Sequence, residues 1–179
     1  CLILPVFLLF SILMLPLNIL HSIPRRIYKI IVIVVAIIIF SIDCYLLLLY
    51  QKTFDTIGHD VVAAIAEQHL TRKAKKEISK LLDGKSIVYY SSWMDNIQNS
   101  PYWENGYNKT KTWHYANVDK GLTYETMPKN ENGDVVNGLE MLTKEMTENY
   151  KELTDSMKVD YLKMIVHMVG DLHCPMHAG

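Results

Sequence analysis

An uninterrupted apolar run at residues 30–40 constrains this chain more than any other feature. A basic segment at residues 24–29 comes directly before the run, and the polar residues Ser41 and Asp43 follow it. A stretch this apolar cannot share a folding unit with the mixed sequence that starts near Gln51. Basic, apolar and polar stretches in this order are typical of an export signal or an uncleaved membrane anchor.

We therefore expect a hydrophobic signal or anchor region at residues 1–50 and a globular domain at residues 51–179. Residues 1–20 are apolar but contain Pro5, Pro16 and Asn18, so they form either a second hydrophobic segment or an over-extended start. The charges of the basic segment stay on the cytoplasmic side of a membrane, which places the domain outside the cytoplasm. The domain is expected to be secreted, periplasmic or anchored to the membrane through its N-terminal segment.

The domain is acidic and holds one cysteine, Cys174. From Thr53 onward there are 14 Lys and Arg residues against 18 Asp and Glu residues, so acidic groups outnumber basic ones by four. This charge excludes the basic surface that holds duplex DNA through its phosphates. If the domain acts on phosphates, bound cations must supply the positive charge. A single cysteine also excludes an internal disulfide bond.

Apolar residues at helical spacing predict an all-α domain. Residues 86–96 are ambiguous between helix and strand, and residues 100–133 read as a long ordered loop, the kind that carries function. Thr71 is a candidate cap for the second helix, and Asp155 or Ser156 for the last one. We expect His69 to be a hydrogen-bonded core residue on the first helix. The expected helices are residues 58–70, 72–82, 135–153 and 157–172.

Potential metal ligands are dense at the end of the last helix. His167 and Asp171 are four residues apart, so both side chains lie on one face and can bind one metal ion. The following turn brings His177 close, and it also contains His173 and Cys174, whose roles stay open between packing and metal contact. A His-x3-Asp pair alone is weak evidence, because such pairs often form a simple hydrogen bond.

Further motifs, in this order and spacing, make the case more specific. The sequence resembles the zinc-dependent single-strand nucleases of the S-one/P-one nuclease family, which share the helical phospholipase C/P-one nuclease fold. The resemblance runs from about residue 54 to the end. The motifs that carry it are Phe54-x4-His59, Trp93-x-Asp95, Trp113-His114 and His167-x3-Asp171-x5-His177.

The resemblance implies a cluster of three zinc ions and a nucleotide pocket. Two close ions would activate a shared water and the third would stabilise the leaving oxygen. Asp95, beside that water, would also steer or accept its proton. An aromatic ring in the pocket stacks on an unpaired base, which favours single strands and nucleotides. The implied roles are as follows: Asp95, His114, His167 and Asp171 hold the first zinc, Asp171, His59 and the residue at Phe54 the second, and His177 the third, while Tyr115, Asn117 and the residue at Gln98 contact substrate.

The sequence also departs from the family pattern. Phe54 stands where the family has an N-terminal tryptophan, so its backbone can chelate zinc only after cleavage behind Thr53. Gln98 stands where many members have an arginine that contacts phosphate, and a neutral amide binds an anion more weakly. The family continues past the motif that ends at Gly179, with a further histidine and aspartate. We therefore expect fewer zinc ions and little activity from this chain, which looks like part of a longer protein.

Three functions remain open at this stage. The first is a zinc-dependent phosphodiesterase that hydrolyses single-stranded RNA or DNA to 5′-nucleotides, with possible 3′-nucleotidase activity. The second is a phospholipase C-like enzyme that cleaves lipid head groups. The third is an inactive zinc-binding fragment. Tyr115 after His114 favours bases, although packing of Tyr115 beside Trp113 is an alternative.

Overall fold

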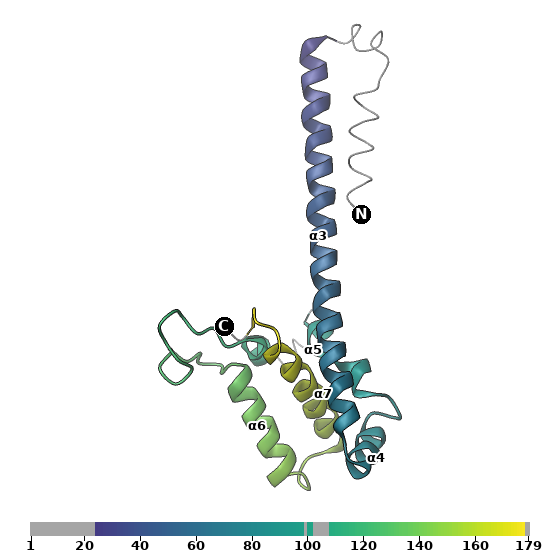
Figure 1. Cartoon of the computed structure of the whole chain (residues 1–179), viewed down its shortest axis with the longest axis vertical. Coiled ribbons are helices and arrows are strands. Elements are labelled where there is room, and N and C mark those ends of the chain that lie inside the picture. Colours follow the sequence, from purple (N-terminus) through teal and green to yellow (C-terminus); the bar gives the residue numbers. More distant parts are fainter. Residues whose placement is uncertain (1–23, 99, 102–107, 178–179) are drawn as a thin grey trace. The chain divides into compact units, whose positions relative to one another are not determined.

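The computed structural model of the chain describes residues 24–98, 100–101 and 108–177 (Figure 1). It divides into two compact units, Cys1–Thr53 and Phe54–Gly179. The described part contains no strand, which confirms the all-α class. Its elements are α3 (Arg25–His69), α4 (Arg72–Leu81), η1 (Ile87–Tyr90), α5 (Trp93–Ile97), η3 (Asn108–His114), α6 (Val135–Glu148) and α7 (Asp155–Leu172).

Helix α3 is much longer than the sequence predicted. We expected a helix to begin at residue 58, but α3 runs without a break from Arg25. No proline interrupts this stretch, and the hydroxyl groups of Ser41 and Thr53 donate to the carbonyl groups one turn earlier, each at 2.8 Å. Among the described residues, the segment Lys29–His69 is the one helix that is long and apolar enough to cross a membrane, on length and composition alone.

The two short segments that follow α3 begin with hydroxyl caps. Thr71 accepts a hydrogen bond from the Ala74 amide at 3.2 Å, which is the predicted cap of α4. Ser86 accepts from the Val88 amide at 3.1 Å and starts η1. The ambiguous residues 86–96 form neither one helix nor a strand, because η1 and α5 are separated by a turn.

The two longer helices differ from their predicted limits. Helix α6 ends at Glu148, five residues before the predicted limit, and Asn149 is its C-cap. Helix α7 is capped by Thr154, whose hydroxyl accepts from the Met157 amide at 3.2 Å, so the predicted caps Asp155 and Ser156 are wrong. The prediction for His69 is also wrong, because this residue is exposed at the end of α3.

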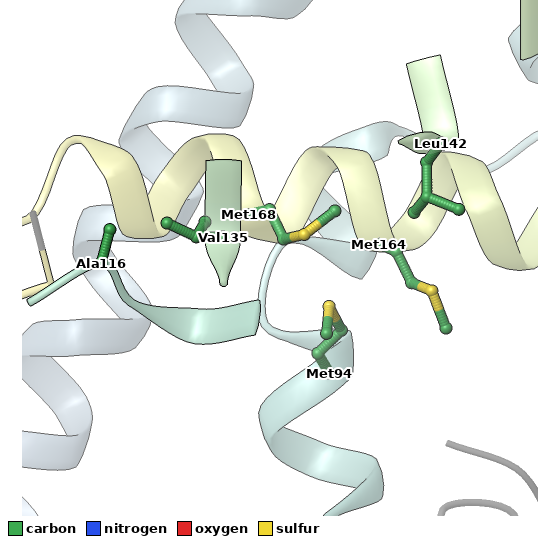
Figure 2. Packing of buried hydrophobic residues seen from close by; sticks show 6 residues of the cluster. All are labelled: Met94, Ala116, Val135, Leu142, Met164 and Met168. Carbon is green, nitrogen blue, oxygen red and sulfur yellow. The ribbon is translucent and has the colours of Figure 1, made fainter. Parts of the chain in front are cut away.

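A buried cluster holds α5, α6 and α7 together (Figure 2). Helices α6 and α7 pack against each other, and Met94 from α5 is completely buried in the same cluster. A second cluster, formed by Ala63, Leu82 and Ile87, packs against α7 through Val159, Leu162 and Val166. This packing fixes one face of α7 against α5, η3 and the end of α3. The first cluster consists of Met94, Ala116, Val135, Leu142, Met164 and Met168.

Candidate metal centre

Helix α7 supplies the two most buried polar side chains of the site. His167 is 0% exposed and Asp171 is 1% exposed. They lie one helical turn apart, and Met164 and Met168 anchor the same helix in the core. His167 Nε2 is 3.3 Å from Asp171 Oδ2. The helix therefore presents an imidazole and a carboxylate to one buried point, as their spacing predicted.

Two further side chains bring their donor atoms to that point. His167 Nε2 is 3.0 Å from His114 Nδ1, which is 3.2 Å from Asp171 Oδ2. Asp95 Oδ1 lies 3.6 Å from His114 Nδ1 and 3.7 Å from His167 Nε2. Ligands placed tetrahedrally about 2.0–2.1 Å from a zinc ion are roughly 3.3–3.4 Å apart. The observed separations of these four donor atoms fit that geometry.

The tautomer of His167 directs a lone pair to the same point. Its Nδ1 lies 2.7 Å from the carbonyl oxygen of Ser91. A carbonyl group only accepts hydrogen bonds, so Nδ1 carries the proton and neutral His167 keeps the Nε2 lone pair. Ser91 is itself held by Asp60, because the serine hydroxyl donates to the Asp60 carboxylate at 2.5 Å. Such a carbonyl behind a histidine is the usual partner of a metal-binding imidazole.

His59 on α3 approaches Asp171 from the other side. Its Nδ1 donates to the carbonyl oxygen of Asp55 at 3.0 Å, and its Nε2 lies 3.1 Å from Asp171 Oδ1. Burial lowers the pKa of His59, but the hydrogen bonds to Asp171 and to the Asp55 carbonyl, with the charges of both carboxylates, outweigh burial and raise it to about 9. A proton thus occupies the position between His59 and Asp171 that a metal ion can take instead.

Asp171 is the common member of both groups. Burial raises the pKa of this carboxyl, but the imidazoles of His114, His167 and His59 outweigh burial and hold the pKa well below its usual range. Its Oδ2 atom is buried and accepts no hydrogen bond of ordinary geometry from the described residues. A buried carboxylate oxygen with this need, facing two imidazole nitrogens, suits a zinc ion.

His177 lies at the edge of this arrangement. Its Nε2 is 4.0 Å from Asp171 Oδ1, and its side chain is 28% exposed. The backbone of the turn is fixed, because the Ala116 amide donates to the His177 carbonyl at 2.8 Å. The structure thus brings His177 close to Asp171, but outside the tetrahedral group.

The remaining predicted residues lie around the centre. Phe54 is inside α3, so its amide nitrogen is part of an intact helix; its side chain lies outside the described residues. Gln98 donates through Nε2 to Asp95 Oδ1 at 3.1 Å. Tyr115 and Asn117 do not contact the tetrahedral group in the described structure, but together they line a cavity of about 320 Å³.

Comparison with known proteins agrees with this geometry. Residues 54–179 match the family described as S1/P1 Nuclease. The chain belongs to the S1/P1 nuclease family. Endonuclease 5 of Arabidopsis thaliana is 26% identical to it over 136 residues, which cover 68% of this chain and 45% of that relative. The chain therefore spans less than half the length of this relative.

The S1/P1 nuclease match begins at Phe54, where the second compact unit also begins. It includes every residue that the sequence resemblance assigned to a site, and the predicted family membership is confirmed. Sequence reasoning missed the residues that support the metal-binding side chains. Ser91 acts through its backbone, which leaves no side-chain signal, whereas Asp60 and Gly170 were identifiable as direct neighbours of His59 and Asp171.

Proposed function

We propose that this chain carries the metal-binding part of a zinc-dependent phosphodiesterase that hydrolyses single-stranded RNA or DNA to 5′-nucleotides, with 3′-nucleotidase activity at the same site. The observation that carries the proposal is the convergence of four donor atoms on one buried point. They come from Asp95, His114, His167 and Asp171, which lie on three separate elements. Assembly of such a group from distant segments is typical of a functional site.

Each side chain has a role in this proposal. Asp95, His114, His167 and Asp171 would hold one zinc ion, and His59 with Asp171 a second. When bound, zinc supplies a water that ionises near neutral pH and positive charge beside the phosphate. The Asp95 side chain is 33% exposed, so its carboxylate reaches the solvent side of the centre and can accept a proton from the attacking water.

Specificity for unpaired bases is assigned to the cavity at Tyr115. The cavity has a volume of about 320 Å³ and also contains Asn117, whose amide can form hydrogen bonds with a base edge. Tyr115 is half-buried, so it presents part of its ring for stacking. A base inside a duplex cannot enter such a pocket without unpairing, which favours single strands. The acidic charge of residues 54–179 also disfavours duplex binding.

A different cavity favours a second candidate, a phosphodiesterase that acts on lipid head groups. This cavity, of about 370 Å³, adjoins His59 and is lined by the apolar residues Ile57, Val61 and Val62. An acyl chain fits apolar walls better than a nucleotide does.

One experiment separates these functions. The full chain in detergent is loaded with zinc and incubated with denatured DNA, duplex DNA and phosphatidylcholine micelles, and soluble products are measured. Release of 5′-nucleotides from denatured DNA alone supports the proposal, and release of phosphocholine supports the lipid enzyme. Zinc binding without any hydrolysis, on matched assays with His167→Gln as the negative control, would leave only the inactive zinc-binding fragment.

A further inference from the structure

A second group of metal-binding side chains lies next to the proposed centre. Donor atoms of Asp55, Cys174 and His177 all lie within 4.8 Å of one another. The family resemblance assigns no ligand role to the Asp55 carboxylate or to the Cys174 thiol. We propose that Asp55, Cys174 and His177 form a thiolate-containing site for a thiophilic divalent cation, with zinc as the preferred ion.

The turn after α7 holds two of these residues in a fixed relation. The Cys174 amide donates to the Asp171 carbonyl and the His177 amide donates to the Cys174 carbonyl, both at 2.9 Å. The Ala116 amide fixes the end of the turn through the His177 carbonyl at 2.8 Å. A Cys-x2-His turn of this kind places a thiol and an imidazole on the same side, at a spacing within the range of zinc sites.

Asp55 completes the group from α3. Its carbonyl oxygen accepts the hydrogen bond from His59, whereas its carboxylate lies 3.9 Å from the same ring, beyond hydrogen-bond distance. The Asp55 side chain is 41% exposed, so it can rotate towards Cys174 and His177 without disturbing the core. The backbone and the carboxylate of Asp55 thus serve two neighbouring sites.

The chemistry of the three ligands selects the ion. A thiolate, an imidazole and a carboxylate together suit zinc and other thiophilic ions, whereas magnesium and calcium prefer oxygen ligands alone. Three protein ligands leave a fourth position open. Cys174 is the one cysteine in residues 54–179, so no disulfide within this unit competes for its sulfur. Cys174 and Asp55 also line the cavity of about 370 Å³, which gives an ion access from solvent.

Cobalt absorption tests for sulfur coordination. The full chain, reduced and in detergent, is titrated with Co²⁺, and the near-ultraviolet band of a cobalt–thiolate bond is measured. We expect this band in the wild type and in Cys44→Ser, the matched thiol control from the first unit. Cys174→Ser should lose it, and Asp55→Asn should need at least tenfold more Co²⁺ to reach half of it. Absence of the band in the wild type, or its persistence in Cys174→Ser, would overturn the proposal.

A second measurement does not depend on a folded Cys174 variant. With Cys1 and Cys44 replaced by serine, Cys174 is the sole thiol, and its alkylation rate is measured with and without Zn²⁺. We expect zinc to slow alkylation at least tenfold and magnesium to have no effect. An equal rate in both conditions would mean that Cys174 only lines the cavity. Neither measurement reads hydrolysis, so the result stands apart from the proposed enzyme activity.

Discussion

Gly170 lies so close to His59 that a Cβ atom at this position would be 2.5 Å from the ring carbon Cδ2. Gly170 is buried within α7, directly before Asp171, so the ring of His59 packs on the helix where a side chain would otherwise be. The absence of a side chain is what lets His59 Nε2 come within 3.1 Å of Asp171 Oδ1.

Gly170→Ala should therefore displace His59 and weaken zinc binding at the His59–Asp171 pair. In a helix, alanine is normally favoured over glycine by about 0.8–1.0 kcal/mol, but overpacking here should instead destabilise the protein by about 1–3 kcal/mol. Isothermal titration with zinc and urea unfolding measure the two effects. Gly58→Ala is the matched control, because a Cβ there meets nothing within 4 Å. Equal behaviour of the two variants would disprove the steric role of Gly170.

Gly138 has a similar relation to Trp113, the residue before His114. A Cβ at Gly138 would lie 2.7 Å from Cδ2 of the indole ring, whose Nε1 donates to the Asn132 carbonyl at 2.8 Å. Gly138→Ala should push the ring away from α6 and lower the free energy of unfolding by about 1–3 kcal/mol. Tryptophan fluorescence and urea unfolding report the change, and Glu140→Ala, at an exposed site of α6, should stay within about 0.5 kcal/mol of wild type.

The hydrogen bond from Tyr124 to Asp134 predicts a loss of stability at high pH. Burial and the Asp134 carboxylate raise the pKa of Tyr124 from 10.0 to about 12 in the folded protein. The folded state thus holds this proton more tightly than the unfolded state does, so its contribution is complete below pH 10 and is lost as the pH rises towards 12. Asp134 also caps α6 by accepting from the amides of Val136 and Asn137, each at 3.0 Å.

In urea unfolding, the wild type should therefore lose more stability between pH 10 and 12 than Tyr124→Phe, which has no titrating hydroxyl at this position. Parallel curves for the two proteins over this range would show that the hydrogen bond has no effect. Tyr89→Phe, at an exposed tyrosine, is the control for a general effect of removing a hydroxyl group.

The sequence predicted the metal-binding side chains better than the elements that carry them. His167 and Asp171 were predictable because a helix places residues four apart on one face. The helix of His59 was predicted to begin at residue 58, whereas α3 begins at Arg25. Hydrophobic periodicity marks where a helix becomes amphipathic, but a helix ends only where a breaking residue or a cap stops it.

Contacts between distant segments were beyond sequence reasoning. The approach of His59 to Gly170, and of Trp113 to Gly138, depends on how α3, α6 and α7 pack. The carbonyl group of Ser91 fixes the tautomer of His167, and any residue type can supply a carbonyl. Packing geometry of this kind has no signature in a single sequence.

Gln98 offers a direct test of phosphate binding. It donates to Asp95 at 3.1 Å, at the exposed side of the centre. A hydrogen bond to a charged group contributes about 1.5–3 kcal/mol, against 0.5–1.5 kcal/mol for a neutral pair, so Gln98→Arg should tighten binding of a hydrolysis-resistant phosphorothioate oligonucleotide roughly tenfold. Asn96→Arg, exposed on the same helix, controls for added charge. Unchanged affinity together with zinc loss would show that residue 98 acts on Asp95 alone.

Tyr115 decides whether the cavity of about 320 Å³ binds a base. Stacking on an aromatic ring contributes about 1–3 kcal/mol per base, so Tyr115→Ala should weaken binding of a single-stranded phosphorothioate oligonucleotide by roughly 5- to 150-fold. Tyr115→Phe keeps the ring and should bind nearly as well as the wild type. An abasic oligonucleotide of the same length has no base to stack, so Tyr115→Ala should bind it like the wild type. Equal losses with both oligonucleotides would mean that Tyr115 serves to pack the loop beside Trp113 and does not contact the base.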